Sequence, residues 1–370
     1  MQAKECIAIV SPTYNTYSET FINNHINFLP GKKIPVYSFG HDAHFGNKTT
    51  LLRMNKFARL FRFLERRIKG ISLMDQEIRS LFKILRKERV SCVLAEYGVT
   101  GAKLVQACKY YQIPLVVHFH GYDASKRDIL ELYENKYRVM FEFSKAIIAV
   151  SSDMKKKLIA FGALEDKVKC IPYGIDLSEF GKKRKSQTTC NFLAVGRFVE
   201  KKAPYLTILA FSEVAKRVAK AKLFMVGDGP LLPICKQLVR SLDISNKVEF
   251  KGILTNQKVA ELMEQTFCFV QHSVTAENGD AEGTPLAILE ASASNLPIVS
   301  TKHAGIKDAV KHGETGFLVD EGDIQDMAKY MIHLAENIEL AETFGIAGRK
   351  WMEQNYDIKK RINELWEVIK

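Results

Sequence analysis

The segment NFLAVGRFVEKKAP, residues 191–204, shows the unit from which most of this chain is built. Its first six residues form a short, largely apolar run, which is typical of a strand buried on both faces. Gly196 then marks a turn, and a helical segment follows. A strand that leads through a glycine turn into a helix indicates a parallel sheet covered by helices.

The same alternation of strands and helices continues on both sides of this segment. Before it, strands are predicted at 5–10, 33–39, 90–96, 113–119, 146–151 and 168–172, with helical segments between them such as 18–29, 52–69, 72–88 and 101–111. From residue 191 onward, strands are predicted at 191–196, 222–227, 247–252, 267–272, 296–301 and 315–319. Because the pattern runs through twice, we expect an α/β protein with two tandem Rossmann-like, doubly wound parallel-sheet domains.

Length and local composition predict the domain boundaries. The chain has 370 residues, and at about 100–200 residues per domain this length favours two domains. The polar, basic segment before Asn191 is the best linker. We therefore expect an N-terminal domain at 1–178, a linker at 179–190, a C-terminal domain at 191–354 and a final amphipathic helix at 355–370.

Composition excludes several protein classes. The contents of 46% hydrophobic and 26% charged residues are typical of a globular protein and not of a disordered or fibrous chain. No run approaches 18 apolar residues, and the first ten residues resemble a strand more than a signal peptide, so we expect a cytoplasmic protein. The seven cysteines include no CxxC pair, which argues against a disulfide framework or a structural zinc site.

Positive charge is concentrated in the N-terminal half of the chain. The net charge is +12, from 54 Lys and Arg against 42 Asp and Glu. Residues 1–180 contain 28 basic and 18 acidic residues, whereas residues 181–370 contain 26 and 24. Residues 48–89 alone contain 13 basic and 4 acidic residues. Such a local excess points to an anionic partner, which could be a membrane surface, a nucleic acid or a phosphorylated substrate.

The segment AENGDAEGTPLAILEAS, residues 276–292, carries the clearest chemical signal. Gly283, Thr284 and a proline precede a predicted helix, whose unpaired amides and dipole favour a phosphate or a sugar hydroxyl. Glu282 stands just before this helix, and Glu290 is four residues after Leu286 on one helical face. Two carboxylates beside an anion site suit a ribose or hexose ring. The alternative is an acid favoured by the helix dipole and a solvated glutamate.

Two further turns follow predicted strands of the C-terminal domain. Arg197 and Lys202 stand at the start of a helix, where cations are unfavourable unless an anion lies between them. Simple solvation of both side chains is the alternative. Gly227 belongs to VGDGP, a turn that allows close approach to a ligand, although the dinucleotide fingerprint GxGxxG is missing.

The segment VVHFHGYDAS, residues 116–125, ends a strand of the N-terminal domain. His118 and His120 share one face of that strand, and strand ends carry ligand chemistry in such sheets. Two buried core histidines are the alternative interpretation. An HxH pair could bind a metal, but no third ligand is evident nearby and the chain contains no DxD sequence. We therefore predict no metal site.

Together these motifs resemble the retaining GT-B glycosyltransferases, specifically the large group 1 family of bacterial lipopolysaccharide, capsule and exopolysaccharide transferases. The strongest marker is the E-x7-E motif formed by Glu282 and Glu290. Supporting markers are GRxxxxK at 196–202, VGDGP at 226–230 and the segment 296–323; PTYNTYSETFI at 12–22 resembles the colanic-acid-type subset. The resemblance implies a GT-B fold with a cleft between the domains, acceptor binding by the first domain and sugar-nucleotide binding by the second. It also implies that the final helix packs back on the N-terminal domain.

The resemblance also implies roles for individual residues. The catalytic group would comprise His120, Glu282, Arg197 and Lys202, with His120 beside the anomeric end of the sugar. Donor-binding residues would be Gly196, Arg197, Lys202, Gly227, Gly252, Ile253, Glu282, Gly283, Thr284, Leu286 and Glu290. Acceptor-binding residues would be Asn15, Glu19, Thr20 and Asp123. Two departures stand out: Tyr14-Asn15-Thr16-Tyr17 replaces a common glycine pair, and Ala203 replaces the usual glycine, which we expect to be tolerated.

The implied reaction is transfer of a hexose from a UDP- or GDP-sugar to a growing cell-surface polysaccharide that is linked to a polyprenyl lipid. It would retain the anomeric configuration and need no metal or other cofactor besides the donor. Two alternatives remain open. One is a catalytically inactive, membrane-docked assembly subunit, and the other is a sugar-nucleotide epimerase of the same fold.

The basic segment 52–69 has its own interpretation. Its apolar residues keep helical spacing, so a packed helix with a solvated basic face would explain it. The more specific hypothesis is that this face binds an anionic membrane surface, which would place the protein peripherally at the inner face of the cell membrane. A nucleic acid is not expected, because no recognised groove-reading or base-stacking module accompanies the charge.

Overall fold

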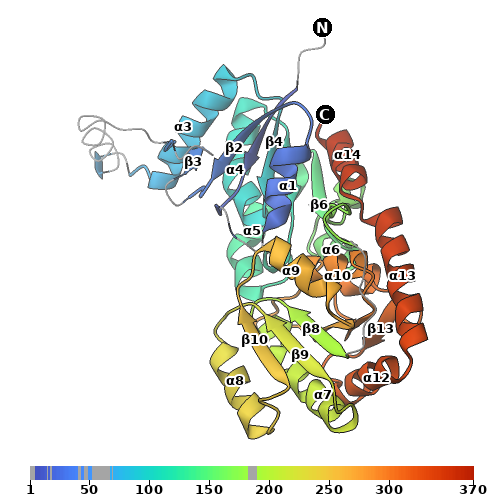
Figure 1. The fold of residues 1–370 in the computed structure, drawn as a ribbon. Helices are drawn as coiled ribbons and strands as arrows, with labels where there is room; N and C mark the ends of the chain where they lie inside the picture. Colours follow the sequence, from blue (N-terminus) through green and yellow to red (C-terminus); the bar gives the residue numbers. More distant parts are fainter. Residues whose placement is uncertain are drawn as a thin grey trace.

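The computed structural model describes residues 5–14, 16, 19–40, 43–45, 49–51, 67–68, 70–181 and 190–370. These residues form two α/β domains, one above the other in Figure 1, each with a central sheet between layers of helices. This arrangement confirms the predicted pair of doubly wound domains. Segment 52–69 lies outside the described residues except for Arg67 and Ile68, as does residue 15 and most of the predicted linker, 182–189.

The first domain contains a seven-stranded sheet with the order β3-β2-β1-β4-β5-β6-β7. Its strands are β1 (Cys6–Val10), β2 (Lys32–Tyr37), β3 (His44–Phe45), β4 (Cys92–Glu96), β5 (Leu115–His118), β6 (Ala146–Ala149) and β7 (Val168–Cys170). All neighbours pair in parallel except β2 and β3. The prediction missed β3, because a strand of two residues has too little sequence to show a period.

Helices cover both faces of this sheet. They are α1 (Thr20–Phe28), α3 (Leu73–Lys87), α4 (Gly98–Tyr111), α5 (Arg127–Phe143) and α6 (Ser152–Ala160), with short 3-10 turns η1 (Tyr122–Ala124) and η2 (Glu165–Lys167). Local sequence explains where α3 begins: Ser72 and Asp75 form a reciprocal capping box. The apolar face of α3 buries Leu81, Phe82 and Leu85 against the core.

The second domain repeats the plan with six parallel strands in the order β10-β9-β8-β11-β12-β13. They are β8 (Asn191–Val195), β9 (Lys222–Val226), β10 (Val248–Gly252), β11 (Cys268–Gln271), β12 (Ile298–Thr301) and β13 (Gly316–Val319). The helices are η3 (Glu200–Lys202), α7 (Pro204–Arg217), α8 (Leu232–Ser241), α9 (Asn256–Glu264), α10 (Leu286–Ala293), α11 (Ile306–Ala309), α12 (Ile324–Glu336) and α13 (Ile338–Asn355). In both domains the strand order reverses beside the first strand, and ligands of such sheets bind at the carboxyl ends of the strands there.

The last helix, α14 (Ile358–Ile369), returns to the first domain. Its residues Ile358, Ile362, Leu365 and Ile369 pack in one cluster with buried residues of β1, β4, β5 and β6. The two domains are thus linked twice, once by the connection before β8 and once by the return of α14 (Figure 1).

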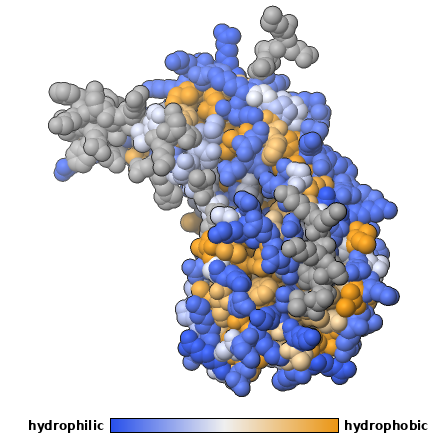
Figure 2. All heavy atoms as spheres, viewed as in Figure 1, coloured by the Kyte–Doolittle hydropathy of each residue, from blue (hydrophilic) through white to orange (hydrophobic). Residues whose placement is uncertain are grey.

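Three further features of the fold are the character of its surface, the state of its cysteines and the apolar character of its helices. On the face shown in Figure 2, hydrophilic residues predominate and hydrophobic residues form separate groups. All seven cysteines are free thiols. Within the described part of the chain, no helix has both the length and the apolar character that a membrane crossing requires.

Candidate active site

A cavity lies between the two domains and encloses roughly 1200 Å³, counting space open to solvent. The first domain contributes Glu19, Thr20, Phe21, Tyr97, His120, Gly121, Tyr122 and Tyr173 to its walls, and the second contributes loops that follow β8, β9 and β10 and the start of α10. These loops stand at the carboxyl ends of their strands, where the topology places a ligand. The cavity therefore collects most of the predicted site residues from both halves of the sequence.

A buried ion pair stands at the second domain's wall. The ammonium Nζ of Lys202 lies 3.3 Å from Oε2 of Glu282, and both side chains are largely buried. Burial alone would raise the pKa of Glu282, but the positive charges of Lys202 and Lys201 outweigh it, so the pKa is lowered. Glu282 is therefore an ionised carboxylate, and its second oxygen, Oε1, is buried with no hydrogen-bond partner among the residues that the structure describes.

A histidine fixes the backbone of Glu282. The Glu282 N–H donates to Nε2 of His303 over 3.0 Å, and Nδ1 of the same ring lies 2.5 Å from Oε1 of Glu321. The other oxygen of Glu321 accepts the N–H of Thr275. This arrangement requires His303 to carry its proton on Nδ1, because Nε2 accepts. The sequence analysis did not identify His303 or Glu321.

Glu290 has a different environment from Glu282. It lines the cavity with Leu286, one helical turn earlier in α10. Burial, aided by the negative charge of Glu179, raises its pKa to about 7. Near neutral pH, Glu290 is thus divided between the protonated and ionised forms in the ligand-free protein.

The predicted cations and glycines surround the same space. Arg197 lines the cavity and has no ion-pair partner within the described part of the chain. Lys201, which the sequence analysis missed, also lines it and pairs with Asp280 at 2.9 Å. Gly227 has a φ of +130°, and a Cβ there would collide with the carbonyl of Gly196, so this turn requires glycine.

Contact between the domains depends on Gly283. A Cβ on Gly283 would collide with the carbonyl of His120 in the first domain. Glycine thus allows the Glu282 loop to reach the end of β5. Thr284 reinforces the contact, because its hydroxyl donates to the carbonyl of Val150.

One end of the cavity is apolar and open. Ile253, Leu254, Asn256 and Val259 line it, and the Ile253 side chain is 53% exposed. Gly252 was predicted beside them but does not line the cavity; its φ of +66° turns the chain after β10. The turn at Gly252 therefore sets the position of Ile253 in the cavity wall, although Gly252 itself does not line the cavity.

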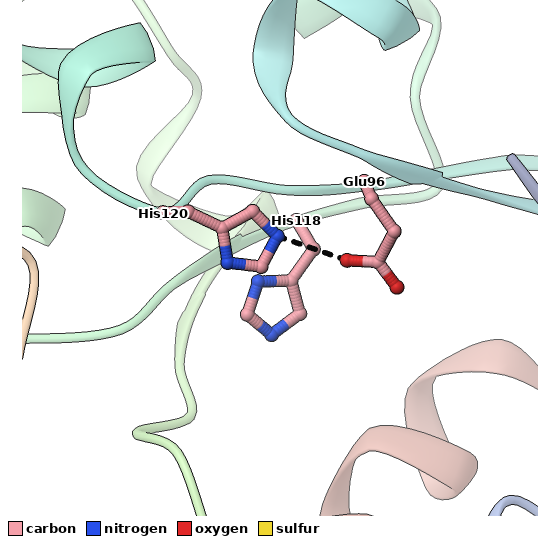
Figure 3. A group of neighbouring side chains, drawn as sticks. All are labelled: Glu96, His118 and His120. Carbon is pink, nitrogen blue, oxygen red and sulfur yellow. Dashed lines mark hydrogen bonds and ion pairs between the residues drawn. The ribbon is translucent and has the colours of Figure 1, made fainter. Parts of the chain in front are cut away.

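A hydrogen-bonded network lies behind the first domain's wall (Figure 3). Oε2 of Glu96 lies 2.9 Å from Nε2 of His120, and Oε1 lies 2.8 Å from Nδ1 of His25. The other nitrogen of His120, Nδ1, lies 2.9 Å from the hydroxyl of Tyr173. Burial would raise the pKa of Glu96, but the two histidines lower it overall. Both ring nitrogens of His120 are therefore occupied within the protein. The sequence offered one signal for Glu96, an acid at the end of an apolar strand.

Glu96, His118 and His120 also form a group whose ligand atoms lie within 4.8 Å of one another. The rings of His118 and His120 are stacked, with an interplanar angle of 10° and centroids 4.5 Å apart. Nitrogen lone pairs lie in the ring plane, so two stacked rings cannot both point at one ion. As arranged, these residues do not fit a metal ion.

The predicted acceptor-binding residues do not all lie at the cavity. Glu19 and Thr20 line the cavity, whereas Asn15 lies outside the described residues. Asp123 is fully buried, and its carboxylate accepts the N–H groups of Gly98, His120 and Gly121. Asp123 therefore holds the turn that follows β5.

Comparisons with known proteins follow the division into two domains. Residues 177–351 match the family model described as "Glycosyl transferases group 1", and residues 19–179 match "Glycosyltransferase Family 4". The amylovoran biosynthesis glycosyltransferase AmsK of Erwinia amylovora is 28% identical over 75% of this chain and 69% of its own length. The putative colanic acid biosynthesis glycosyltransferase WcaL of Escherichia coli K12 is 26% identical over 72% of this chain and 65% of its own length. The chain thus spans about two thirds of the length of these relatives.

A solved structure matches the fold over almost the whole chain. The crystal structure of Alr3699/HepE from Anabaena in complex with UDP has a TM-score of 0.75, with 16% identity. The match covers 98% of this chain and 99% of that one. The two-domain arrangement around the cavity is therefore a known fold.

Proposed function

Because the chain has the GT-B fold and joins a Family 4 glycosyltransferase domain to a group 1 glycosyltransferase domain, we propose that it transfers a hexose from a nucleotide diphosphate sugar to a glycan acceptor. The relatives named for amylovoran and colanic acid biosynthesis support a role in making an exopolysaccharide. The UDP bound to the matching Anabaena protein supports a nucleotide-sugar donor. Retention of the anomeric configuration is part of the proposal.

The observation that carries this proposal is the unpartnered oxygen of Glu282. A buried carboxylate oxygen without a donor is costly, so this oxygen favours a ligand that brings a hydroxyl or amide hydrogen. Glu282 lines the cavity beside Lys202 and Arg197, which suit the adjoining phosphates. A molecule with a sugar next to a diphosphate meets both requirements.

The chemistry of each side chain indicates its role in the proposed reaction. Breaking the bond between the sugar and the diphosphate builds negative charge on the leaving phosphate. Arg197 and Lys202 are donors positioned at the cavity for that charge, and removing one such donor typically costs about 10²–10³ in rate. The ionised form of Glu290 can accept two ribose hydroxyls.

Same-face transfer accounts for the proposed retention. The acceptor oxygen bonds to the anomeric carbon on the side that the phosphate leaves, and the acceptor proton passes to a leaving phosphate oxygen. This route needs no protein nucleophile. His120 lines the cavity, and because both its ring nitrogens are engaged within the first domain, it would position that wall beside the sugar.

The decisive experiment measures donor binding and turnover separately. Thermal shift with UDP-, GDP- and ADP-sugars identifies the donor, because a ligand at 100 times its Kd stabilises by about 2.7 kcal/mol. Product analysis with that donor then separates three activities. Sugar transfer or slow donor hydrolysis supports the proposal, conversion to another nucleotide sugar indicates an epimerase, and binding without any turnover indicates an inactive subunit.

We also propose that the protein works at the inner face of the cell membrane on a polyprenyl-linked acceptor. The basic segment 52–69 supports this, at about 1 kcal/mol for each basic residue near an anionic surface. Sedimentation with anionic and neutral vesicles at low and high salt tests it. Binding to anionic vesicles at low salt, lost when Arg59, Arg62 and Arg66 are changed together to Gln, is the expected result. Absence of the protein from the anionic pellet would refute membrane docking.

A further inference from the structure

The two walls of the cavity differ in charge. The second domain contributes the cations Arg197, Lys201 and Lys202 and the acids Glu282 and Glu290. Lys202 is paired with Glu282 and Lys201 with Asp280, so Arg197 is the cation without an ion-pair partner among the described residues. Among the lining residues that the structure describes in the first domain, Glu19 is the one acidic residue, and there is no lysine or arginine. On the second domain's side, Arg197 is therefore a cation available to a diphosphate, whereas Glu19 gives the described part of the opposite wall a negative charge.

Aromatic side chains form the rest of the first domain's wall. Phe21, Tyr97, Tyr122 and Tyr173 line the cavity together. Tyr97 and Tyr122 lie with ring centroids 5.2 Å apart and planes inclined by 33°. The hydroxyl of Tyr122 has no hydrogen-bond partner within the described parts of the chain. Such a surface provides apolar faces together with a free polar group.

The backbone of Tyr97 is strained at this position. Its φ of +71° and ψ of 139° are rare for a residue with a side chain. Conformations of this kind cost of order 1–3 kcal/mol and occur most often at functional sites. The strain is held by a hydrogen bond from the Tyr97 hydroxyl to Oε1 of Glu19, at 2.7 Å. Tyr97 and Glu19 thus form one structural unit in the wall.

The carboxylate of Glu19 can accept hydrogen bonds from the hydroxyl groups of a ligand. Its Oε1 accepts from Tyr97, and its Oε2 accepts from the hydroxyl of Thr13 at 2.5 Å. A carboxylate offers about four lone-pair positions, so each oxygen can accept one more donor. A phosphate or carboxylate ligand offers no such donor when ionised and would be repelled by the charge of Glu19.

On the basis of the proposed function, we infer that the acceptor presents an uncharged sugar unit to the first domain. This sugar lies against Tyr97 and Tyr122 and donates a hydroxyl hydrogen to Glu19. Acceptors whose reacting end carries a phosphate or a carboxylate are excluded by the same residues. The inference adds a substrate class to the proposed transfer, because it specifies the charge of the acceptor's terminal unit.

A matched pair of ligands tests the inference directly. Methyl β-glucoside and methyl β-glucuronide differ at C6, where the second carries a carboxylate. Their binding to the protein saturated with UDP, or with GDP if that is the nucleotide that binds, is measured by ligand-observed NMR. Methyl galactosides and mannosides extend the neutral series. We expect at least one neutral glycoside to bind at least tenfold tighter than the glucuronide.

Variants of Glu19 and Tyr122 distinguish a loss of glycoside recognition from a general disturbance of the structure. Glu19→Gln should weaken the neutral glycoside about tenfold and reduce its preference over the glucuronide to within threefold, because the repulsive charge is gone. Tyr122→Ala should weaken all glycosides. Nucleotide affinity should change less than twofold in both variants. Glu165→Gln, in η2 at the opposite edge of the sheet, and Tyr110→Ala, which is 79% exposed, serve as controls.

Three outcomes would overturn the inference. They are equal or tighter binding of the glucuronide, an unchanged preference in Glu19→Gln, and no saturable binding by any neutral glycoside while the nucleotide binds. Failure of the proposed function would be distinguishable, because the protein would then bind neither the nucleotide nor a nucleotide sugar in the thermal-shift measurement.

Discussion

The carboxylate of Glu282 lies 3.3 Å from the ammonium group of Lys202, so the two motifs that identify the second domain meet in one buried ion pair. Neither side chain has much contact with water. Removing one partner of a buried pair leaves the other charge uncompensated. We therefore expect these residues to affect stability as well as the proposed binding of the donor.

Lys202→Ala should destabilise the protein by about 3 kcal/mol or more, because Glu282 is left buried and unpaired. It should also weaken use of the nucleotide sugar at least tenfold. Arg197→Ala should cause a similar loss of activity with little change in stability, because Arg197 is exposed and forms no ion pair within the described residues. Urea denaturation and donor kinetics of both variants check this difference. Equal destabilisation would show that the ion pair has no structural role.

Glu290 should make donor binding depend on pH. Its pKa is about 7 in the free protein, and in the proposed donor complex its ionised form would accept the ribose hydroxyls. Affinity should therefore fall as the pH decreases below 7, by up to about tenfold per unit, and level off above it. Calorimetric titration with a nucleotide sugar, whose phosphates do not titrate near neutrality, measures this. The dependence should disappear in Glu290→Gln, with weaker binding at high pH.

The same carboxyl group should affect stability with the opposite trend. The folded pKa of Glu290 is raised from 4.5 to about 7, so the native state favours the protonated form. Stability should be lost as the pH rises from about 4.5 through 7, by about 3–4 kcal/mol in total. In the ligand-free protein, Glu290→Gln should therefore be more stable than wild type at pH 8 and nearly equal at pH 5. Denaturant unfolding at the two pH values provides the test, and a gain of equal size at both would contradict it.

Glu96→Gln should impair turnover more than donor binding. The amide group of glutamine presents one oxygen in place of two, so it cannot accept from both His25 and His120. If His120 loses its hydrogen bond to residue 96, we expect the turn after β5, whose His120 carbonyl contacts Gly283, to shift. We expect kcat to fall at least tenfold and Kd for the nucleotide sugar to change less than threefold. A loss confined to Kd would place the network in donor binding instead.

His303→Asn should lower activity through the backbone of Glu282. His303 accepts the Glu282 N–H at Nε2 and binds Glu321 at Nδ1, and an asparagine is too short to do both. The expected result is a higher KM for the nucleotide sugar with unchanged affinity for the free nucleotide. His303→Gln, which is longer, should recover part of the loss. A variant with wild-type kinetics would show that the loop needs no such support.

Activity should persist in excess chelator. The group formed by Glu96, His118 and His120 has stacked rings that do not point at a common ion. Transfer assays in EDTA, with and without added Mg²⁺ or Mn²⁺, measure the effect. Loss of activity in EDTA that a divalent ion restores would contradict the proposed metal independence.

The sequence by itself determined the elements and the local groups of the site. Apolar, β-branched runs predict strands because the backbone period is local, and every strand that the structure describes, except the two-residue β3, begins within two residues of its predicted position. The spacing of Leu286 and Glu290 places both on one face of α10 for the same reason. Glu282, Arg197 and Lys202 were recognisable from motifs that each lie within one short segment.

Only the tertiary structure decided which of these groups meet. Glu96 reaches His25 and His120, and Gly283 reaches the carbonyl of His120, because two sheets and two domains pack at particular distances. The same packing buries Asp123 and gives Glu282 and Glu290 opposite pKa shifts. Burial and neighbouring charge depend on contacts between residues far apart in the chain, and local sequence patterns carry no information about those distances.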